Sequence, residues 1–322
     1  MNHILVTGGA GYIGSFMVQK LLDLGHTVSV IDNLSRGYID VVDKRAHFYH
    51  GDLLNNHFLN DVFSKNSFSA VIHFAGFISV GESVKYPDKY FKNNTMATFY
   101  LIEKMRENKV NNIIFSSTAA VYGNPQKIPI TEDHSKMPES PYGESKLLVE
   151  NGLLWYNHEF GINSVSLRYF NASGAALDGT RGERHLPETH IIPNVIKSVL
   201  DDKPFTLYGN DYETLDGTCI RDYIHILDLV NAHLLALDKL QKDNGAFYYN
   251  VGTGNGYTNK QVIEMIEKIS ERNIKLTIES RRSGDSAILV ADNQKIKKEL
   301  GFTPQYSDLK TIVKSAWMWH NR

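Results

Sequence analysis

Short apolar runs alternate with longer amphipathic segments through the first half of the chain. The runs are rich in valine and isoleucine and do not alternate strictly with polar residues, which is typical of buried parallel strands. Candidate strands are HILVTG (3–8), TVSVID (27–32), AHFYHGD (46–52), AVIHFAG (70–76) and NIIFSS (112–117). Between the first two, YIGSFMVQKLLDLG (12–25) has apolar residues at helical spacing and ends at a glycine, a natural helix C-cap. The pattern predicts repeated strand–helix units.

This alternation continues to NSVSLRYFN (163–171) and then loosens. We therefore predict an α/β fold in which residues 1–171 form a doubly wound parallel sheet of Rossmann type. Residues 172–190 are rich in glycine and predict a long loop, where binding residues commonly lie. Further helices are expected near 191–201, 226–240, 258–270 and 306–320. Residues 172–322 should form mainly a smaller α/β substrate domain, with some segments returning to the sheet.

Composition narrows the range of functions. The 322 residues carry a net charge of -2 and are 42% hydrophobic, so nothing favours nucleic-acid binding, which needs clustered positive charge. The single cysteine, Cys219, cannot form an internal disulfide and fits a reducing compartment. MNHILVTGG enters a strand directly without signal-peptide form, and no apolar run approaches the roughly 20 residues of a membrane span. We expect a cytoplasmic protein with no membrane partner.

A glycine-rich turn, TGGAGYIG (7–14), joins the first strand to the first helix. Gly8, Gly11 and Gly14 permit a tight turn and a close approach of the backbone to a pyrophosphate, which then lies at the helix N-terminus. Asp32 ends the second strand about 20 residues further on, where a carboxylate accepts the adenosine ribose hydroxyls. This context predicts a dinucleotide site rather than ordinary turn glycines.

Asp32 also favours NAD over NADP, because a carboxylate at this position repels a 2′-phosphate. Arg36 is the competing signal, since a basic residue just past the strand can receive that phosphate; otherwise it is a solvated loop charge. Asp52, after the third strand, could reach the adenine or serve only as a turn residue.

PYGESK (141–146) places Tyr142 and Lys146 four residues apart at the start of an expected helix, on one face. Taken alone, a tyrosine and a lysine at this spacing more often lie on a solvent-exposed helix face without a shared function. Beside a dinucleotide it has a chemical purpose, because a lysine ammonium and an oxidised nicotinamide both favour the phenolate. A tyrosine of this kind can act as general base on an alcohol while hydride leaves to the ring.

Together these and later motifs resemble the extended short-chain dehydrogenase/reductase family over nearly the whole chain. The shared segments are TGGAGYIG, DN (32–33), HFAG, VGES (80–83), SSTAAVYG, YGESK, LRYFN, YGND, DGTCIRDYIH and RRSGD. The last three are similar to the branch that epimerises nucleotide sugars at C4. The resemblance implies NAD-dependent interconversion of UDP-galactose and UDP-glucose through a 4-keto sugar, with NAD retained throughout.

Two alanines sharpen this expectation. Related nucleotide-sugar 4,6-dehydratases carry an Asp-Glu pair just after the hydroxyl position to drive loss of water. Here the hydroxyl position is Thr118, in place of the usual serine, and Ala119 and Ala120 follow it. Without an acid or base there, a 4-keto sugar can only take its hydride back, which favours epimerisation.

The resemblance assigns the remaining contacts residue by residue. Arg221 and Arg282 should bind the diphosphate through planar guanidinium groups, while Tyr169 and Phe170 lie near the nicotinamide or simply pack in the core. Cofactor contacts are expected from Gly8, Gly11, Tyr12, Ile13, Gly14, Asp32, Asn33, Leu34, Asp52, Leu53, Phe74, Ala75, Gly76, Asn93, Ser116, Tyr142, Lys146, Tyr169 and Phe170. Among the substrate-binding residues, Tyr208 is available to stack on uracil, and Asp285 should hold the uridine ribose. The full set of expected substrate contacts is Thr118, Asn171, His190, Thr206, Leu207, Tyr208, Arg221, Arg282 and Asp285.

Three positions depart from the family's usual pattern. Ile78 replaces a lysine that contacts the cofactor, and His190 stands where asparagine is better known. Leu289 occupies a sugar-pocket wall position that is tyrosine in epimerases restricted to unmodified hexoses. A UDP-N-acetylhexosamine or UDP-pentose 4-epimerase is therefore the nearest alternative.

The sequence also bears on metal binding, on two alternative functions and on the oligomeric state. His3, His26, His73 and His225 lack ligand spacing, so no metal is expected. A dehydrogenase that releases NADH would need cofactor exchange at every turnover, and a non-catalytic NAD sensor would have no need of Tyr142. Residues 88–105 and 147–156 could form core; in family members these helices form an intermolecular bundle, which suggests a homodimer.

Overall fold

The computed structural model describes residues 2–282 and 285–322, and the chain divides into two compact units. Ser283 and Gly284 of the RRSGD motif lie outside the described residues. The first unit comprises residues 1–123, 135–168 and 232–249, and the second comprises 124–134, 169–231 and 250–322.

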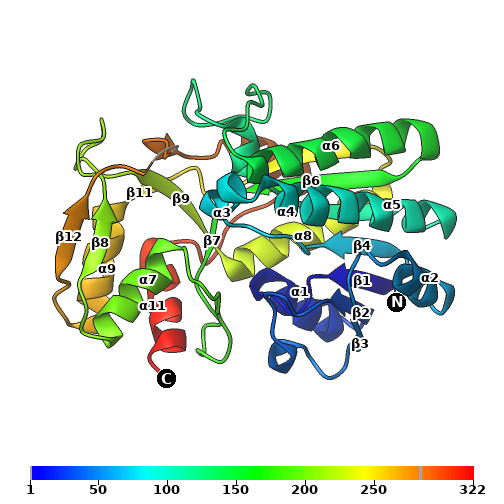
Figure 1. The fold of residues 1–322 in the computed structure, drawn as a ribbon, viewed down its shortest axis with the longest axis horizontal. Coiled ribbons are helices and arrows are strands. Elements are labelled where there is room, and N and C mark those ends of the chain that lie inside the picture. Colours follow the sequence, from blue (N-terminus) through cyan, green and yellow to red (C-terminus); the bar gives the residue numbers. More distant parts are fainter. Residues whose placement is uncertain (1, 283–284) are drawn as a thin grey trace. The chain divides into compact units, whose positions relative to one another are not determined.

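The first half of the chain alternates strands and helices, as Figure 1 shows in its blue to green ribbon. The strands are β1 (His3–Thr7), β2 (Thr27–Asp32), β3 (His47–His50), β4 (Ala70–His73), β5 (Asn112–Thr118) and β6 (Asn163–Tyr169). The α-helices are α1 (Tyr12–Asp23), α2 (Asn56–Ser64), α3 (Val80–Lys85), α4 (Pro87–Tyr90), α5 (Ala97–Glu107) and α6 (Pro141–Phe160). Short helical turns are η1 (Ile39–Val41), η3 (Ala119–Tyr122) and the π-helical η2 (Phe91–Met96).

These strands form a seven-stranded sheet in the order β10-β6-β5-β4-β1-β2-β3, in which β10 is Ala246–Val251. The pairs β1–β2, β1–β4, β2–β3 and β4–β5 are parallel. Strand order reverses between β1 and β4, so the carboxyl ends of these strands frame the crevice where such folds bind ligands. The predicted doubly wound sheet is confirmed.

Helices cover both faces of this sheet. On one face, α2, α5 and α6 contribute to a core that includes Leu59, Leu101 and Val149 together with Val71 and Phe115 of the strands. On the opposite face lies α1, which buries Phe16, Met17, Val18 and Leu21. Burial on both faces explains why the strands read as continuous apolar runs rather than as alternating ones.

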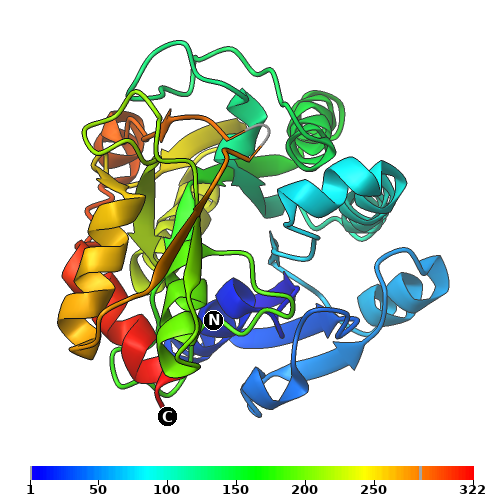
Figure 2. The same ribbon diagram turned by 60° about the vertical axis from the view of Figure 1, so that its left-hand side comes forward.

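The second unit is built on smaller sheets. Its strands are β7 (Asn171–Ser173), β8 (Phe205–Tyr208), β9 (Ile220–His225), β11 (Gly256–Thr258), β12 (Leu276–Glu279) and β13 (Ile288–Leu289). Strands β7, β11 and β13 pair with β9, and β8 pairs with β12. Its helices are α7 (Ile191–Leu200), α9 (Asn259–Ser270), α10 (Gln294–Leu300) and α11 (Leu309–His320), while α8 (Ile226–Lys242) runs from this unit into the first. Figure 2 shows α7, α9 and α11 side by side, around a core that contains Ile196, Ile263 and Ile312.

The sequence placed most elements within a few residues. The first helix ends at Asp23 rather than at residue 25, because Gly25 already adopts a positive φ of 81° in the turn that follows. The expected loop 172–190 contains the end of β7, a strand too short to carry a periodic signal. Among the described residues, no helix is long and apolar enough to cross a membrane.

Candidate active site

The predicted catalytic residues come from β5 and α6. Thr118 is the last residue of β5, and its Oγ1 accepts the amide of Ala120 (3.1 Å), which caps η3. Helix α6 begins after Ser140, whose Oγ accepts the amide of Gly143 (3.2 Å), and Pro141 occupies its first turn. Tyr142 and Lys146 therefore lie in the first two turns of a well-capped helix.

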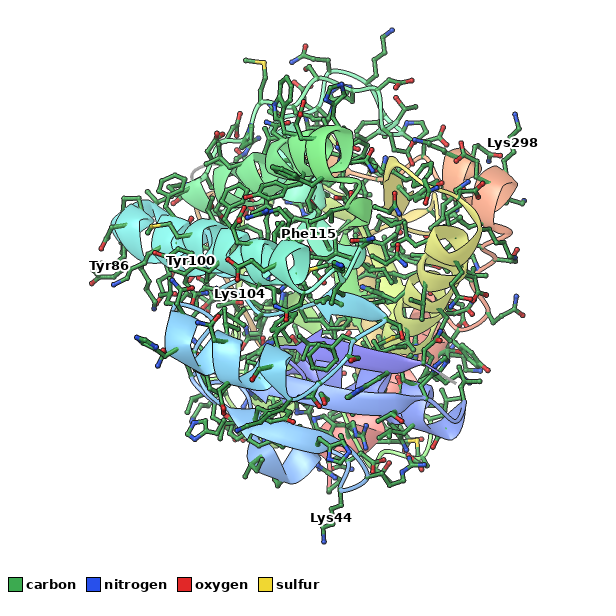
Figure 3. All side chains as sticks on the ribbon, turned by 90° about the vertical axis from the view of Figure 1, so that its right-hand side faces the viewer. Lys44, Tyr86, Tyr100, Lys104, Phe115 and Lys298 are labelled. Carbon is green, nitrogen blue, oxygen red and sulfur yellow. The ribbon has the colours of Figure 1, made fainter. Side chains whose placement is uncertain are left out.

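Both side chains are buried, and burial changes their acidity. Burial raises the pKa of Tyr142, and a hydrogen bond with Thr118 lowers it in part. Burial also lowers the pKa of Lys146 to about 8, against the opposing charge of Glu150. The Lys146 ammonium lies 4.9 Å from the ring centroid of Phe115, which is labelled in Figure 3. Burial of both groups is a tertiary effect that the spacing of Tyr142 and Lys146 did not reveal.

The glycine-rich turn has the shape that the sequence predicted. Gly8 has a φ of 73°, and a Cβ there would lie 2.6 Å from the amide nitrogen of Ala75. A Cβ on Gly14 would collide with the carbonyl of Gly8, whereas Gly11 has only that carbonyl nearby, at 3.2 Å. Gly8 and Gly14 thus close the turn, and Gly11 begins α1 with room beside its backbone.

Asp32 lies at the end of β2 and faces the same turn. Its carboxylate accepts the amides of Ala10 (3.0 Å) and Leu34 (2.8 Å). Burial raises the pKa of Asp32, and these two backbone hydrogen bonds oppose that rise. Leu34 adopts a φ of 58°, uncommon for a leucine. The Asn33 amide donates to Asp52 (2.9 Å), so the three predicted adenosine-side residues Asp32, Asn33 and Asp52 lie together.

A buried amide that the sequence reasoning missed lies on η2. Asn94 accepts the amide of Phe77 (2.8 Å) and donates to its carbonyl (2.9 Å) and to Ser145 on α6 (3.2 Å). Asn93, the residue assigned from the resemblance, donates to Asn94 (3.0 Å). The π-helical turn is the feature that directs Asn94 inwards, and such turns are frequent at functional sites. Nothing in the local sequence indicates it.

Phe74, another residue assigned to the cofactor from the resemblance, packs against His233 with ring centroids 4.8 Å apart, and Ile78, which stands at the expected lysine position, is exposed. His73, at the end of β4, bonds Thr7 (2.6 Å) and Thr98 (2.8 Å). Burial and the nearby Lys146 charge lower the pKa of His73 to about 3, so the ring is neutral.

In the second unit the predicted nucleotide-binding residues form two groups. In one, Arg221 donates to the carbonyl of Ser286 (2.8 Å) and lies 3.6 Å from Asp285, while the Arg282 guanidinium lies 4.0 Å from the ring centroid of Tyr208. Leu289 pairs with Arg221 across β13 and β9. The structure thus brings the wall residue next to a predicted diphosphate ligand.

The other group surrounds a pocket lined by Asn171, His190, Tyr223 and His320. Asn171 donates to the carbonyl of Asp222 (2.9 Å), and His190 Nδ1 lies 2.6 Å from Glu183. Partial burial of the ring opposes its charge, yet the carboxylates of Glu183 and Glu188 raise the pKa of His190 to about 10. His190 therefore presents a positive charge at the N-terminus of α7, where asparagine would be neutral.

His190 belongs to a cluster with Glu183, His185 and Glu188, whose potential ligand atoms lie within 4.8 Å of one another. Glu183 Oε1 lies 2.9 Å from His185 Nδ1 and 2.6 Å from His190 Nδ1, and Glu188 accepts the amides of Thr189 and His190. Hydrogen bonds and ion pairing account for these contacts. The four histidines considered from the sequence did not include this group.

The roles assigned to the remaining residues stay predictions. Tyr12 and Ile13 begin α1, Leu53 follows β3, and Ser116 lies in β5 beside Phe115. Thr206 and Leu207 lie in β8 with Tyr208, while Tyr169 and Phe170 separate β6 from β7.

A Rossmann-type sheet, a glycine turn with an acidic partner, and a buried Thr–Tyr–Lys set define a nucleotide-dependent enzyme that acts on alcohols. A model of the NAD dependent epimerase/dehydratase family matches residues 4–252, and the chain belongs to this family.

Individual relatives agree with this assignment. The chain is 46% identical over 318 residues to the UDP-glucose 4-epimerase of Halalkalibacterium halodurans, covering 98% of this chain and 95% of that one. Among solved structures, the UDP-glucose 4-epimerase of Brucella ovis in complex with NAD superimposes with a TM-score of 0.95 at 42% identity, covering 98% of each chain. The UDP-Glc/GlcNAc 4-epimerase of Campylobacter jejuni has a TM-score of 0.87 at 39% identity and covers 100% of this chain and 99% of its own.

Proposed function

We propose that this protein is a UDP-glucose 4-epimerase, which interconverts UDP-galactose and UDP-glucose with bound NAD. The observation that carries the proposal is that Thr118, Tyr142 and Lys146 are all buried, and that the residues directly after Thr118 are Ala119 and Ala120 of η3. The set supplies a base for a sugar hydroxyl, whereas the alanines supply neither acid nor base for elimination.

The residues present fit NAD. A Cβ at Gly8 or Gly14 would clash with backbone, so these glycines hold the turn that admits a pyrophosphate beside Gly11. Asp32 keeps acceptor capacity for ribose hydroxyls beyond its two backbone hydrogen bonds. When bound, NAD supplies a hydride acceptor at sugar C4 and a positive charge that favours the phenolate form of Tyr142.

During the proposed reaction, the catalytic side chains transfer one proton. Tyr142 as phenolate takes the proton of the sugar 4-hydroxyl, and Thr118, hydrogen-bonded to it, shares or relays that proton. The charged form of Lys146 stabilises the phenolate against the burial that disfavours it. Tyr142 returns the proton to the C4 oxygen as hydride is returned to the opposite face of C4. Because the hydride taken from C4 is given back to C4, the net redox change is zero.

The nucleotide, rather than the sugar, should carry the binding energy, because the sugar must turn over between the two hydride transfers. Arg221 and Arg282 are proposed to bind the diphosphate, His190 to add a positive charge, and Tyr208 to stack on uracil. The 4.0 Å contact of Arg282 with the Tyr208 ring supports a shared role for these two residues.

The test is product analysis after purified protein is mixed with UDP-galactose and no added cofactor. We expect many turnovers to UDP-glucose, and loss of turnover in Tyr142→Phe with UDP-sugar binding preserved. No product even with added NAD would contradict the proposal, and a fully active Tyr142→Phe variant would contradict the base assignment.

A broader substrate range is the second candidate, favoured by one observation. Leu289 pairs with Arg221 and is smaller than the tyrosine found in hexose-restricted epimerases. The relative from Campylobacter jejuni is described as acting on both UDP-Glc and UDP-GlcNAc, which supports testing acetylated substrates.

We also propose a homodimer that forms through α5 and α6. Trp155, 69% exposed, and the exposed Leu148 lie seven residues apart and so on one face of α6, and Leu154 and Phe160 of this helix are exposed as well. Phe99 of α5 stacks on Tyr156 with ring centroids 6.2 Å apart, and Figure 3 shows Tyr100 and Lys104 along α5. Light scattering should report twice the 36.4 kDa of one chain, and Trp155→Glu should give monomers; a monomeric wild-type protein would exclude the dimer.

A cytoplasmic location is proposed because the lone buried Cys219 is suited to a reducing compartment. Cell fractionation tests it.

A further inference from the structure

A buried ion pair lies directly behind the catalytic residues in the first unit. Arg168 on β6 donates to both carboxylate oxygens of Glu150 on α6, with Nη2–Oε2 at 2.6 Å and Nε–Oε1 at 2.9 Å. Both side chains are essentially inaccessible to solvent. A buried pair of this kind gives little net stability compared with apolar residues of the same size, so its presence calls for another reason.

The pair connects to both sides of the catalytic set. Glu150 Oε1 also accepts the hydroxyl of Ser117 (2.5 Å), the residue before Thr118 on β5. Arg168 Nη1 donates to the hydroxyl of Tyr122 (2.9 Å), which closes the η3 turn that Thr118 caps. The residues on either side of Thr118 are thus tied to one carboxylate, directly or through Arg168.

The same carboxylate lies on the helix that carries the other catalytic residues. Glu150 is one helical turn beyond Lys146 and two turns beyond Tyr142, so the three share one face of α6. Its negative charge favours the ammonium form of Lys146, against burial.

Among the described residues, the other groups around Lys146 offer no counter-charge comparable to Glu150. His73 of β4 is neutral, β5 presents the Phe115 ring, and a Cβ on Gly76 would lie 3.3 Å from both Lys146 Nζ and the Asn94 amide oxygen. Helices α3 and α4 supply Glu82 and Tyr90, which bond each other (2.9 Å), and the Tyr90 ring packs edge-on near Tyr142.

We propose that Glu150 is a positioning residue for epimerisation, which fixes the Thr118 end of β5 against α6 and keeps Lys146 charged. The proposal rests on the proposed function for its kinetic readouts. The proposal predicts that two substitutions in this hydrogen-bond network affect the kinetics differently. Loss of the charge should alter the pH dependence, whereas loss of the Ser117 hydrogen bond alone should alter the geometry.

The charge is tested with Glu150→Gln, which keeps the side-chain shape. We expect kcat to fall about tenfold near neutral pH with little change in KM, and the alkaline limb of the kcat–pH profile to move to lower pH. Glu150→Asp, which restores the charge, should return the limb towards that of the wild type. A folded Glu150→Gln protein with the wild-type limb would overturn the electrostatic role, because a purely structural residue does not shift a pH profile.

The geometry is tested with Ser117→Ala, which leaves the Glu150–Arg168 pair intact and does not depend on Glu150→Gln folding. We expect a several-fold loss of kcat with an unchanged limb. The matched control is Ser166→Ala on β6, which should behave as the wild type, because the buried Ser166 hydroxyl has no hydrogen-bond partner among the described residues. Equal kcat in the two serine variants would overturn the positioning role.

A substrate-independent readout separates this inference from the proposed function. The titration of Lys146 can be followed by NMR of ¹³C-labelled lysine, assigned with Lys146→Met, in wild-type and Glu150→Gln protein. A lower midpoint in Glu150→Gln supports the inference even if UDP-galactose proves not to be the substrate. An unchanged midpoint overturns the electrostatic role even if wild-type protein epimerises normally.

Discussion

Gly143 packs so closely against Ala120 that a Cβ on the glycine would lie 2.5 Å from the alanine carbonyl oxygen. This contact joins the first turn of α6 to the turn η3 after Thr118. It therefore sets how near Tyr142 lies to the Thr118 hydroxyl.

Gly143→Ala should consequently be harmful although alanine favours helix. We expect a loss of about 1–3 kcal/mol in the free energy of unfolding from overpacking, and a fall in kcat of up to about 100-fold because Tyr142 is displaced. Urea unfolding and steady-state kinetics measure these effects. Gly81→Ala on α3 is the control, since, apart from the chain neighbours and the backbone of its own helix, no atom of the described residues lies within 4 Å of its Cβ position. Equal behaviour of the two variants would refute the steric argument.

Asp32→Ala should weaken NAD binding by about 10- to 100-fold, as expected for lost hydrogen bonds to a charged group. It should also reduce discrimination against NADP, because the carboxylate no longer repels a 2′-phosphate. Chromatography of nucleotide released from denatured protein, followed by reconstitution with either cofactor, measures both effects. An unchanged NAD content would show that Asp32 does not hold the ribose.

Leu289→Tyr should narrow the substrate range. We expect kcat/KM for UDP-N-acetylglucosamine to fall by about tenfold or more relative to UDP-glucose, since the larger ring would stand beside Arg221 on the neighbouring strand. Leu289→Met, similar in volume, is the control and should leave the ratio unchanged. If the tyrosine variant keeps the wild-type ratio, Leu289 does not line the sugar pocket.

The Glu183–His190 ion pair should make stability depend on alkaline pH. The pKa of His190 is raised from 6.5 to about 10, so the folded protein binds the proton more tightly than the unfolded chain does. The resulting stabilisation is complete below pH 6.5 and is lost as pH rises through about 10. Because the side chain is 39% exposed, solvent screening keeps the effect modest.

This prediction is measured as the difference in melting temperature between wild type and His190→Gln across pH 6 to 10. The difference should be largest at pH 6 and shrink towards pH 10. A difference that is constant across this range would mean that His190 does not gain its proton on folding.

Local signals were sufficient for much of this protein. The Gly8, Gly11 and Gly14 spacing, the acidic end of β2 and the Tyr142–Lys146 spacing each depend on a few neighbouring residues and on the geometry of one turn or one helix. The sequence determined the Rossmann-type sheet in the same way, because burial on both faces leaves its mark in every strand. Ala119 and Ala120 argue against loss of water from the 4-keto sugar whatever surrounds them, because a methyl side chain is neither an acid nor a base.

Tertiary structure alone decided what surrounds these residues. One example is the burial that raises the pKa of Tyr142 and lowers that of Lys146. Others are the hydrogen bonds of Asn94 with Phe77 and Ser145 and those of Glu150 with Ser117 and Arg168, which join residues 17 to 51 positions apart. In the sequence, Gly143 is only a residue that disfavours helix. The structure shows why a glycine is needed there, because Ala120 packs against it. Such contacts leave no periodic trace, because desolvation and long-range hydrogen bonds depend on which segments meet in space rather than on spacing along the chain.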